Sequence, residues 1–231
     1  MFLKEKIRYY VNMIGVLYAC LTFAYWNNKQ IHNLGNTGLM GNIHAMTAPL
    51  VTKYIDREIY GGRNIREEIY DTLQGSVLDL CCGTGFSTKP GNVGVDTSLA
   101  MLRFASIYNP GSHYIFGNAE TYGKPNEYDT VTIMFAFHEM PRRAHRRILR
   151  NAITVARKKV VVVDISCDYK ASRTMLSGEP YLLDYLDEFP RTIKNLWPKE
   201  YDWRLEYKES PMWNSTVLVK NHVHLWECTI P

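Results

Sequence analysis

The chain has few of the features that mark exported, metal-binding or nucleic-acid-binding proteins. Its five cysteines, at positions 20, 81, 82, 167 and 228, show neither zinc-ligand spacing nor a disulfide framework. We therefore expect no metal site and an intracellular, reducing compartment. The net charge is only +4, and the basic residues cluster once, between 142 and 159. Because an apolar stripe runs through this cluster, we interpret it as the solvated face of a helix, and no nucleic-acid partner is expected.

Apolar runs are short as well. The mostly apolar stretch from Val11 to Trp26 has about 16 residues, fewer than the roughly 20 needed to cross a bilayer. Three basic residues precede it, as in secretory signals, but no convincing cleavage site follows. The segment fits a packed helix or one lying on a membrane surface through residues 1–30, a membrane anchor, or a cleaved signal. We predict an N-terminal apolar helical extension over residues 1–45.

Apolar strand patterns alternate with helical patterns over most of the remaining sequence, without internal repeats or low-complexity segments. Strands are expected at Val77–Asp79, Val93–Asp96, His113–Phe116, Asp129–Ala136 and Val160–Asp164. Helices are expected at Val51–Tyr60, Ile65–Leu73 and Ser98–Ile107. Two alternating segments in the tail, Trp203–Tyr207 and His222–Thr229, predict an antiparallel pair. The fold class is therefore α/β, a doubly wound, seven-stranded, mostly parallel and Rossmann-like sheet.

The most informative stretch is a glycine turn directly after the first predicted strand. Gly83, Thr84 and Gly85 turn the chain so that backbone N–H groups can approach a ligand, since glycine lacks a Cβ. Asp79 and Asp96 end the first two strands, and a carboxylate in the second position can accept bonds from both ribose hydroxyls. In a doubly wound sheet ligands bind at these carboxyl ends.

Four blocks in this order, VLDLCCGTG, VGVD, GNAE and YDTVTIMFAFHEMP, resemble the class I S-adenosylmethionine-dependent methyltransferases. Within this family, the sequence most resembles the small-molecule enzymes of the ubiquinone and menaquinone biosynthesis type. The resemblance extends over roughly residues 65–165. The resemblance implies a methyltransferase domain over 46–231, with a lid and substrate region at about 166–213. It implies methyl transfer from S-adenosylmethionine to a small, lipophilic or aromatic acceptor. Without an Asn-Pro-Pro-aromatic block after the fourth strand, amino-methylation of DNA bases is disfavoured.

The resemblance also implies roles for individual residues. Asp79 would orient the amino group of the methionine moiety, Asp96 would hold the ribose, and Asn118 would meet the adenine edge. The full set of implied cofactor-binding residues is Asp79, Cys81, Gly83, Thr84, Gly85, Asp96, Thr97, Met101, Asn118, Ala119 and Phe135. The sequence departs from the family pattern at Cys81, where the first glycine is usual, and at Asn118, where an acid is usual.

Candidates for catalysis and acceptor binding follow the fourth strand and the fifth. His138 is a general base, a packing residue of the pocket wall or a hydrogen-bonding partner of a loop, and Glu139 beside it is a second catalytic candidate. The predicted acceptor-binding residues are Phe137, Tyr169, Tyr181 and Trp197. Two other functions stay open: a catalytically silent cofactor-binding scaffold, and a nucleotide-dependent dehydrogenase. Thr88, which stands where the dinucleotide pattern has a small residue, argues against the dehydrogenase.

Overall fold

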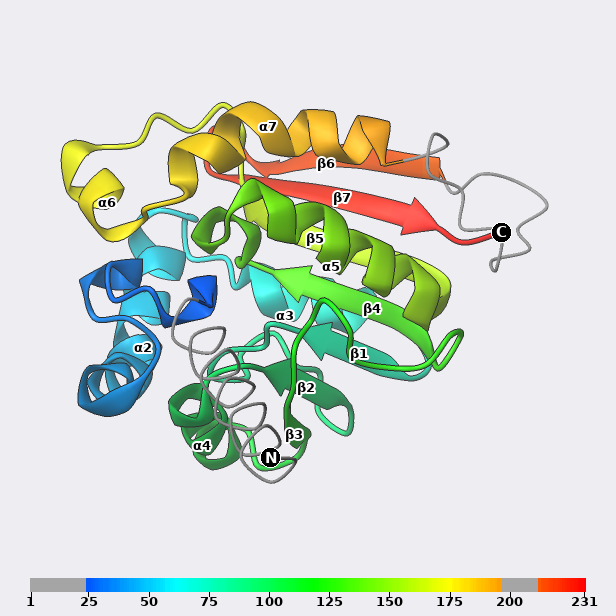
Figure 1. Ribbon diagram of the computed structural model, residues 1–231, viewed down its shortest axis with the longest axis horizontal. Helices are drawn as coiled ribbons and strands as arrows, with labels where there is room; N and C mark the ends of the chain where they lie inside the picture. Colours follow the sequence, from blue (N-terminus) through cyan, green and yellow to red (C-terminus); the bar gives the residue numbers. More distant parts are fainter. Residues whose placement is uncertain (1–23, 197–211) are drawn as a thin grey trace, which may run out of the picture.

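The computed structural model describes residues 24–196 and 212–231, and these form one seven-stranded sheet with helices on both faces (Figure 1). The strand order is β3-β2-β1-β4-β5-β7-β6. The first five strands are parallel, and β7 runs antiparallel to both β5 and β6. The strands are β1 (Val77–Leu80), β2 (Val93–Asp96), β3 (His113–Phe116), β4 (Tyr128–Met134), β5 (Ala156–Ile165), β6 (Met212–Val219) and β7 (Val223–Thr229). The predicted fold class is confirmed.

The helices sort onto the two faces of the sheet through their buried side chains. Buried residues of α5 and α7 join one hydrophobic cluster, and those of α3 join the cluster on the opposite face. The described helices are α2 (Gly38–Glu58), α3 (Ile65–Thr72), α4 (Leu99–Tyr108), α5 (Arg142–Val155), α6 (Arg173–Gly178) and α7 (Leu182–Asn195). Three short 3-10 turns complete the set: η1 (Tyr25–Asn27), η2 (Ile31–Asn33) and η3 (Phe137–Glu139).

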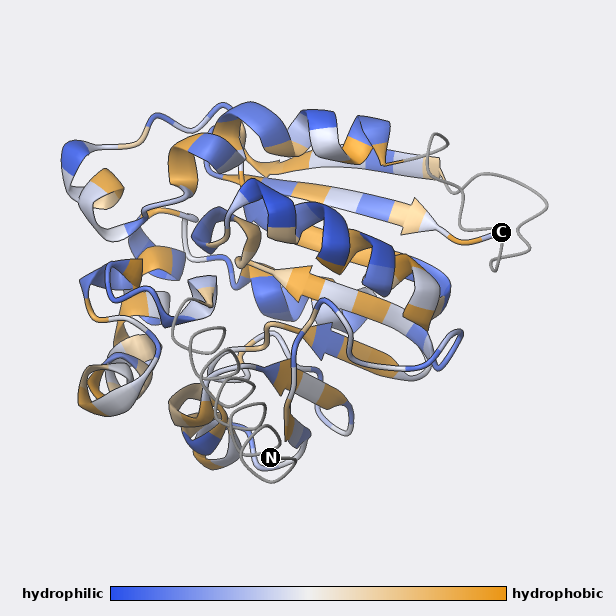
Figure 2. Cartoon of the chain, viewed as in Figure 1, coloured by the Kyte–Doolittle hydropathy of each residue, from blue (hydrophilic) through white to orange (hydrophobic). Residues whose placement is uncertain are grey.

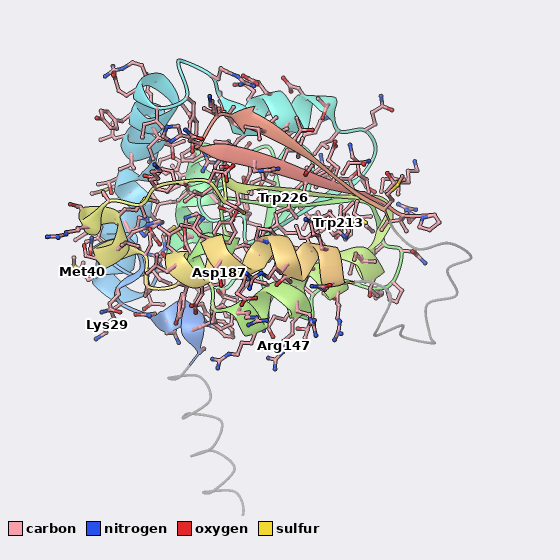
Figure 3. All side chains as sticks on the ribbon, turned by 90° about the horizontal axis from the view of Figure 1, so that it is seen from above. Lys29, Met40, Arg147, Asp187, Trp213 and Trp226 are labelled. Atoms are coloured by element: carbon pink, nitrogen blue, oxygen red, sulfur yellow. The ribbon has the colours of Figure 1, made fainter. Side chains whose placement is uncertain are left out.

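Alternation along β5 shows how the apolar strands build both clusters. Val160 and Val162 belong to the cluster under α5, whereas Val161 and Val163 belong to the one under α3. Since successive side chains of a strand point to opposite faces, a strand covered on both sides must be apolar throughout. The outer side of α5 is mainly hydrophilic (Figure 2). In Figure 3 Arg147 on α5 and Asp187 on α7 mark exposed positions, whereas Trp226 lies buried against Phe189 of α7.

Three sequence predictions differ clearly from the structure at element boundaries. The helix predicted at Val51–Tyr60 belongs to α2, which begins at Gly38 and therefore crosses the predicted boundary between residues 45 and 46. The basic stretch 142–159 is helical only to Val155, because Ala156 begins β5 and Lys159 pairs with Thr130 of β4. The basic side chains beyond the helix form ion pairs instead, with Lys158 Nζ 3.0 Å from Asp129 Oδ1. The antiparallel pair exists, but β6 lies at Met212–Val219, and the predicted strand Trp203–Tyr207 lies outside the described residues.

The predicted N-terminal extension is described only from residue 24 onward. There it is helical, with η1, η2 and the start of α2. The apolar run and its membrane interpretations fall mostly outside the described residues. Within 24–196 and 212–231, no helix combines the length and the apolar character needed to cross a membrane.

Candidate functional site

A cavity of about 600 Å³ lies at the carboxyl ends of β1, β2 and β4. One wall comes from the loops after these strands, where the chain order of the sheet reverses between β1 and β4. The other walls come from η1, η2, α2 and α6, segments far away in the sequence. A cavity of this size at a topological switch point suits a nucleotide-sized ligand together with a small second molecule.

The glycine turn forms part of the cavity wall, as the sequence predicts. Gly83 has a φ of +51°, and a Cβ built there would meet no atom within 4 Å. Gly83 therefore leaves open space beside its backbone. Gly85 does not line this cavity. Its φ is +82°, and a Cβ there would collide with the ring of Tyr114, so its glycine is needed for packing.

Cys81, the irregular position of the turn, is in the same left-handed region with a φ of +62°. A glycine reaches this region without strain, which explains why the family pattern has one there. Cys81 lines the cavity, and burial raises the pKa of its thiol well above the ordinary value. The thiol is therefore neutral and acts as a packing group, not as a nucleophile.

Asp79 is fully buried behind the cavity wall and does not line the cavity. Its carboxylate accepts bonds from three hydroxyls: Ser87 and Thr88 at 2.8 Å each, and Thr132 at 3.0 Å. Burial raises its pKa to about 6, against the lowering effect of these hydroxyls. In this structure Asp79 ties the glycine loop to β4. The predicted contact with an amino group stays a prediction.

Asp96 ends β2 and does line the cavity. Its Oδ2 accepts the N–H of Gly83 at 2.9 Å, and its Oδ1 accepts the N–H of Ser98 at 2.8 Å. Burial raises its pKa to about 6, while these amide bonds oppose the rise. Each oxygen keeps a free lone pair, so a carboxylate held in this way can accept bonds from two neighbouring hydroxyls.

Five other residues of the implied cofactor-binding set lie in the same wall. Thr84, Thr97, Met101, Asn118 and Ala119 all line the cavity. The loop before α2 adds a residue that sequence reasoning missed. Asn36 also lines the cavity, and its buried Oδ1 has no hydrogen-bond partner among the described residues. Its backbone oxygen accepts the hydroxyl of Ser98, which brings the α2 loop against the end of β2.

The end of β4 supplies an aromatic floor. Phe135 lines the cavity, and its backbone has a φ of +54°. The Cζ of Arg66 lies 4.1 Å from the centre of the Phe135 ring. Tyr60 stacks on Phe135 with ring centres 6.2 Å apart. Arg66, on α3, also lines the cavity and was not predicted from the sequence. It places a cation at this end of the cavity, held over an aromatic face.

His138 and Glu139, the predicted catalytic residues, both line the cavity. His138 Nδ1 lies 2.6 Å from Oδ1 of Asp164, the residue before the last of β5, and Oδ2 of Asp164 accepts the N–H of Phe137 at 2.8 Å. Burial alone would lower the pKa of His138, but Asp164 outweighs it and raises that pKa to about 9. At neutral pH His138 is therefore an imidazolium, which has no free lone pair to act as a general base.

This pair makes a testable contribution to stability. Because the folded pKa of His138, about 9, exceeds the unfolded value, the stabilisation is complete below about pH 6.5 and disappears as pH rises through 9. The shift corresponds to on the order of 3 kcal/mol. Between pH 6 and pH 10 the unfolding free energy of the wild type should fall by about this amount more than that of His138→Asn, as measured by denaturant titration. Equal losses in both proteins would contradict the buried ion pair.

Glu139 belongs to a cluster with two residues that sequence reasoning did not assign to catalysis. Its Oε1 lies 2.9 Å from Nε2 of His32, and Nδ1 of His32 contacts Oε1 of Glu179. Burial lowers the pKa of His32, but the two carboxylates overcome this and raise it well above the ordinary value. No spacing signal links these residues, because they come from η2, η3 and the end of α6. Among the described side chains, no group of His, Cys, Asp and Glu is arranged to hold a metal ion.

The predicted acceptor-binding residues are not all brought to the cavity. Tyr169 lines it. Phe137 is fully buried and packs on the tilted ring of Phe189, with ring centres 4.7 Å apart. Tyr181 does not line the cavity either, and its hydroxyl accepts a hydrogen bond from Asn28 Nδ2 at 3.3 Å. Trp197 lies outside the described residues. In the predicted lid region, α6 contributes to the cavity wall, whereas α7 packs on α5.

Comparison with known proteins supports the resemblance in this part of the chain. Residues 77–159 match a family model described as a methyltransferase domain. The matched segment runs from β1 into β5 and contains the glycine turn, Asp96 and η3. Together with the strand order, this match agrees with the resemblance to class I methyltransferases. A search of the curated proteins gave no match.

Solved structures show the same fold at low sequence identity. A DhpI–SAH complex has a TM-score of 0.57 and 13% identity, covering 82% of this chain and 92% of that chain. A SAM-dependent methyltransferase from Aquifex aeolicus has a TM-score of 0.54 and 14% identity, covering 79% of this chain and 98% of that chain. The plantazolicin methyltransferase BamL, solved with a triazolic desmethylPZN analog and SAH, has a TM-score of 0.52 and 16% identity, covering 81% of this chain and 95% of that chain. At these identities the likeness concerns the fold.

Proposed function

We propose that the protein is an S-adenosylmethionine-dependent methyltransferase that acts on a small-molecule acceptor. The observation that carries this proposal is the pairing of Gly83 with Asp96 at the cavity wall. The glycine leaves open space beside its backbone, and the neighbouring carboxylate keeps lone pairs for two hydroxyls. The family match over 77–159 supports methyl transfer as the chemistry. The finer resemblance to the ubiquinone and menaquinone type stays a prediction.

The residues present fit this cofactor. Asp96 would hold the ribose, and the unpartnered Oδ1 of Asn36 would accept a donor from the nucleoside. Arg66, over the ring of Phe135, is the cation that we propose for the methionine carboxylate. Asp79 acts indirectly by fixing the glycine loop. When bound, the cofactor supplies a methyl group on a sulfonium, whose leaving group is already activated.

The role proposed for this chain is therefore chiefly binding, alignment and exclusion of water. His138, held as an imidazolium by Asp164, fixes η3 at the cavity and positions Glu139 beside it. A small acceptor is supported by the natural-product methyltransferase among the similar structures, which binds a triazolic analog. The remaining part of the cavity, lined by Tyr169 and by η1 and η2, would hold the acceptor.

A calorimetric titration tests the cofactor assignment. We expect S-adenosylhomocysteine to bind with one site per chain, and NAD to bind at least tenfold more weakly. Tight NAD binding without binding of S-adenosylhomocysteine would favour the dehydrogenase alternative instead. Binding of S-adenosylhomocysteine with no turnover of labelled methyl donor on any metabolite extract would favour the silent scaffold.

The two glycines of the turn give a matched pair of variants. Gly83→Ala should fold, at a cost of about 1 kcal/mol for its positive φ, but weaken S-adenosylhomocysteine binding because the methyl group enters the cavity. Gly85→Ala should chiefly lower stability, by about 2 kcal/mol or more, because the methyl group meets Tyr114. Calorimetry and denaturant unfolding measure the two effects. The opposite pattern would contradict the assignment of Gly83 to the ligand side.

A further inference from the structure

The cluster of His32, Glu139 and Glu179 is not used by the cofactor site, yet all three residues line the same cavity. His32 stands between the two carboxylates, with one ring nitrogen on each. Its own backbone is in the left-handed region, with a φ of +51°. The three segments that carry these residues meet at the cavity, so the cluster forms part of the wall on the side that remains for the acceptor.

The charges in this part of the wall do not balance. His138 and Asp164 form a neutral ion pair with each other. Glu139 and Glu179 contribute two negative charges, against which His32 supplies one positive charge. The cluster therefore carries an excess of one negative charge. Because charge in a low-dielectric site is costly unless it is paired, this excess favours a cation among the molecules that enter the cavity.

Glu179, which lines that cavity, also has one unpartnered side-chain atom. Glu179 is only 6% exposed, and its Oε1 contacts His32. Its buried Oε2 has no hydrogen-bond partner among the described residues. An unsatisfied carboxylate oxygen at such burial costs free energy that a bound donor would recover. A neutral donor such as a hydroxyl would pair this oxygen but leave the excess negative charge uncompensated, and a negatively charged group would be repelled.

Aromatic side chains from η1 and the loop after β5 line the same cavity. The rings of Tyr25 and Trp26 meet edge to face at 5.0 Å, and Tyr169 contributes a third ring. Aromatic faces accept both apolar groups and cations. The wall therefore suits a molecule with an apolar or aromatic body and a positively charged, hydrogen-bond-donating end.

We propose that the methyl acceptor is an amine whose N–H donates to Oε2 of Glu179, an inference that rests on the methyltransferase function proposed above. The amine enters as an ammonium ion and transfers one proton to the Glu179 carboxylate, which frees the nitrogen lone pair. That lone pair forms the N–C bond to the methyl carbon as the C–S bond breaks, and the bonding pair stays on sulfur. His32 and Glu139 are positioning residues that hold Glu179 in place.

The test compares three probes of similar size on the wild-type protein saturated with S-adenosylhomocysteine: 2-phenylethylamine, 2-phenylethanol and 3-phenylpropionate. Calorimetry or ligand-observed NMR should show the amine binding at least tenfold more tightly than the other two. Any other order, including no binding of the amine, overturns the proposal. Since S-adenosylhomocysteine binding is measured first, failure of the methyltransferase assignment is distinguished from failure of the amine assignment.

Glu179→Gln tests the named residue, with Glu58→Gln on the exposed side of α2 as the matched control. The amine preference should fall to less than threefold in Glu179→Gln and stay unchanged in Glu58→Gln, while both bind S-adenosylhomocysteine as the wild type does. A preference that survives in a folded Glu179→Gln protein overturns the role of this residue. If Glu179→Gln does not fold, the wild-type probe series still decides whether the cavity selects amines.

Discussion

Asp96→Ala is expected to weaken the binding of S-adenosylhomocysteine by about 100-fold or more. In the proposed cofactor site, the substitution would remove two charge-assisted hydrogen bonds to the ribose, together worth about 3 kcal/mol or more. It also releases the N–H groups of Gly83 and Ser98, which the carboxylate holds at 2.9 and 2.8 Å. Isothermal titration calorimetry measures the loss directly.

Two further variants separate ligand contact from a general loss of structure. Asp96→Asn keeps one acceptor oxygen, so its affinity should lie between those of the wild type and Asp96→Ala. Asp71→Ala removes an exposed carboxylate on α3 and should leave affinity unchanged. An Asp96→Ala protein that is folded by circular dichroism and binds with wild-type affinity would refute the ribose assignment.

Phe137→Ala is expected to destabilise the protein by about 3–5 kcal/mol, the largest stability effect among the substitutions considered. The ring is fully buried and packs on Phe189 at 4.7 Å and on His145 at 5.4 Å. Its removal leaves a cavity between η3, α5 and α7 that these helices can fill only partly. The unfolding free energy from urea titration is the measurement.

Phe116→Ala serves as the control, because that ring is 61% exposed at the edge strand β3 and should cost less than about 1 kcal/mol. The comparison also separates the predicted acceptor contact of Phe137 from its packing role. If Phe137→Ala kept wild-type stability and changed only acceptor binding, the packing role seen in the structure would be refuted.

The local patterns of the sequence were sufficient to predict the fold class and one part of the site, the glycine turn with Asp96. Buried parallel strands need continuous apolar runs, which made β1, β2, β4 and β5 recognisable, and the carboxyl ends of parallel strands lie at the same end of the sheet. That is why the glycine turn and Asp96 were predicted together before any contact was known. The first of the two tail strands, β6, was not predicted, because it is exposed along most of its length and has only a weak apolar pattern.

Tertiary structure decided which side chains reach the cavity. Phe137 and His138 are neighbours in η3, yet one enters the core and the other the cavity wall, a choice set by packing against α7. His32 and Glu179 come from opposite halves of the chain and meet only because η2 and α6 close over the sheet edge. The sequence by itself determined the parallel part of the sheet, the glycine turn and the position of Asp96, since these depend on local periodicity and spacing. The acceptor side depends on contacts between distant segments, and only the folded chain reveals them.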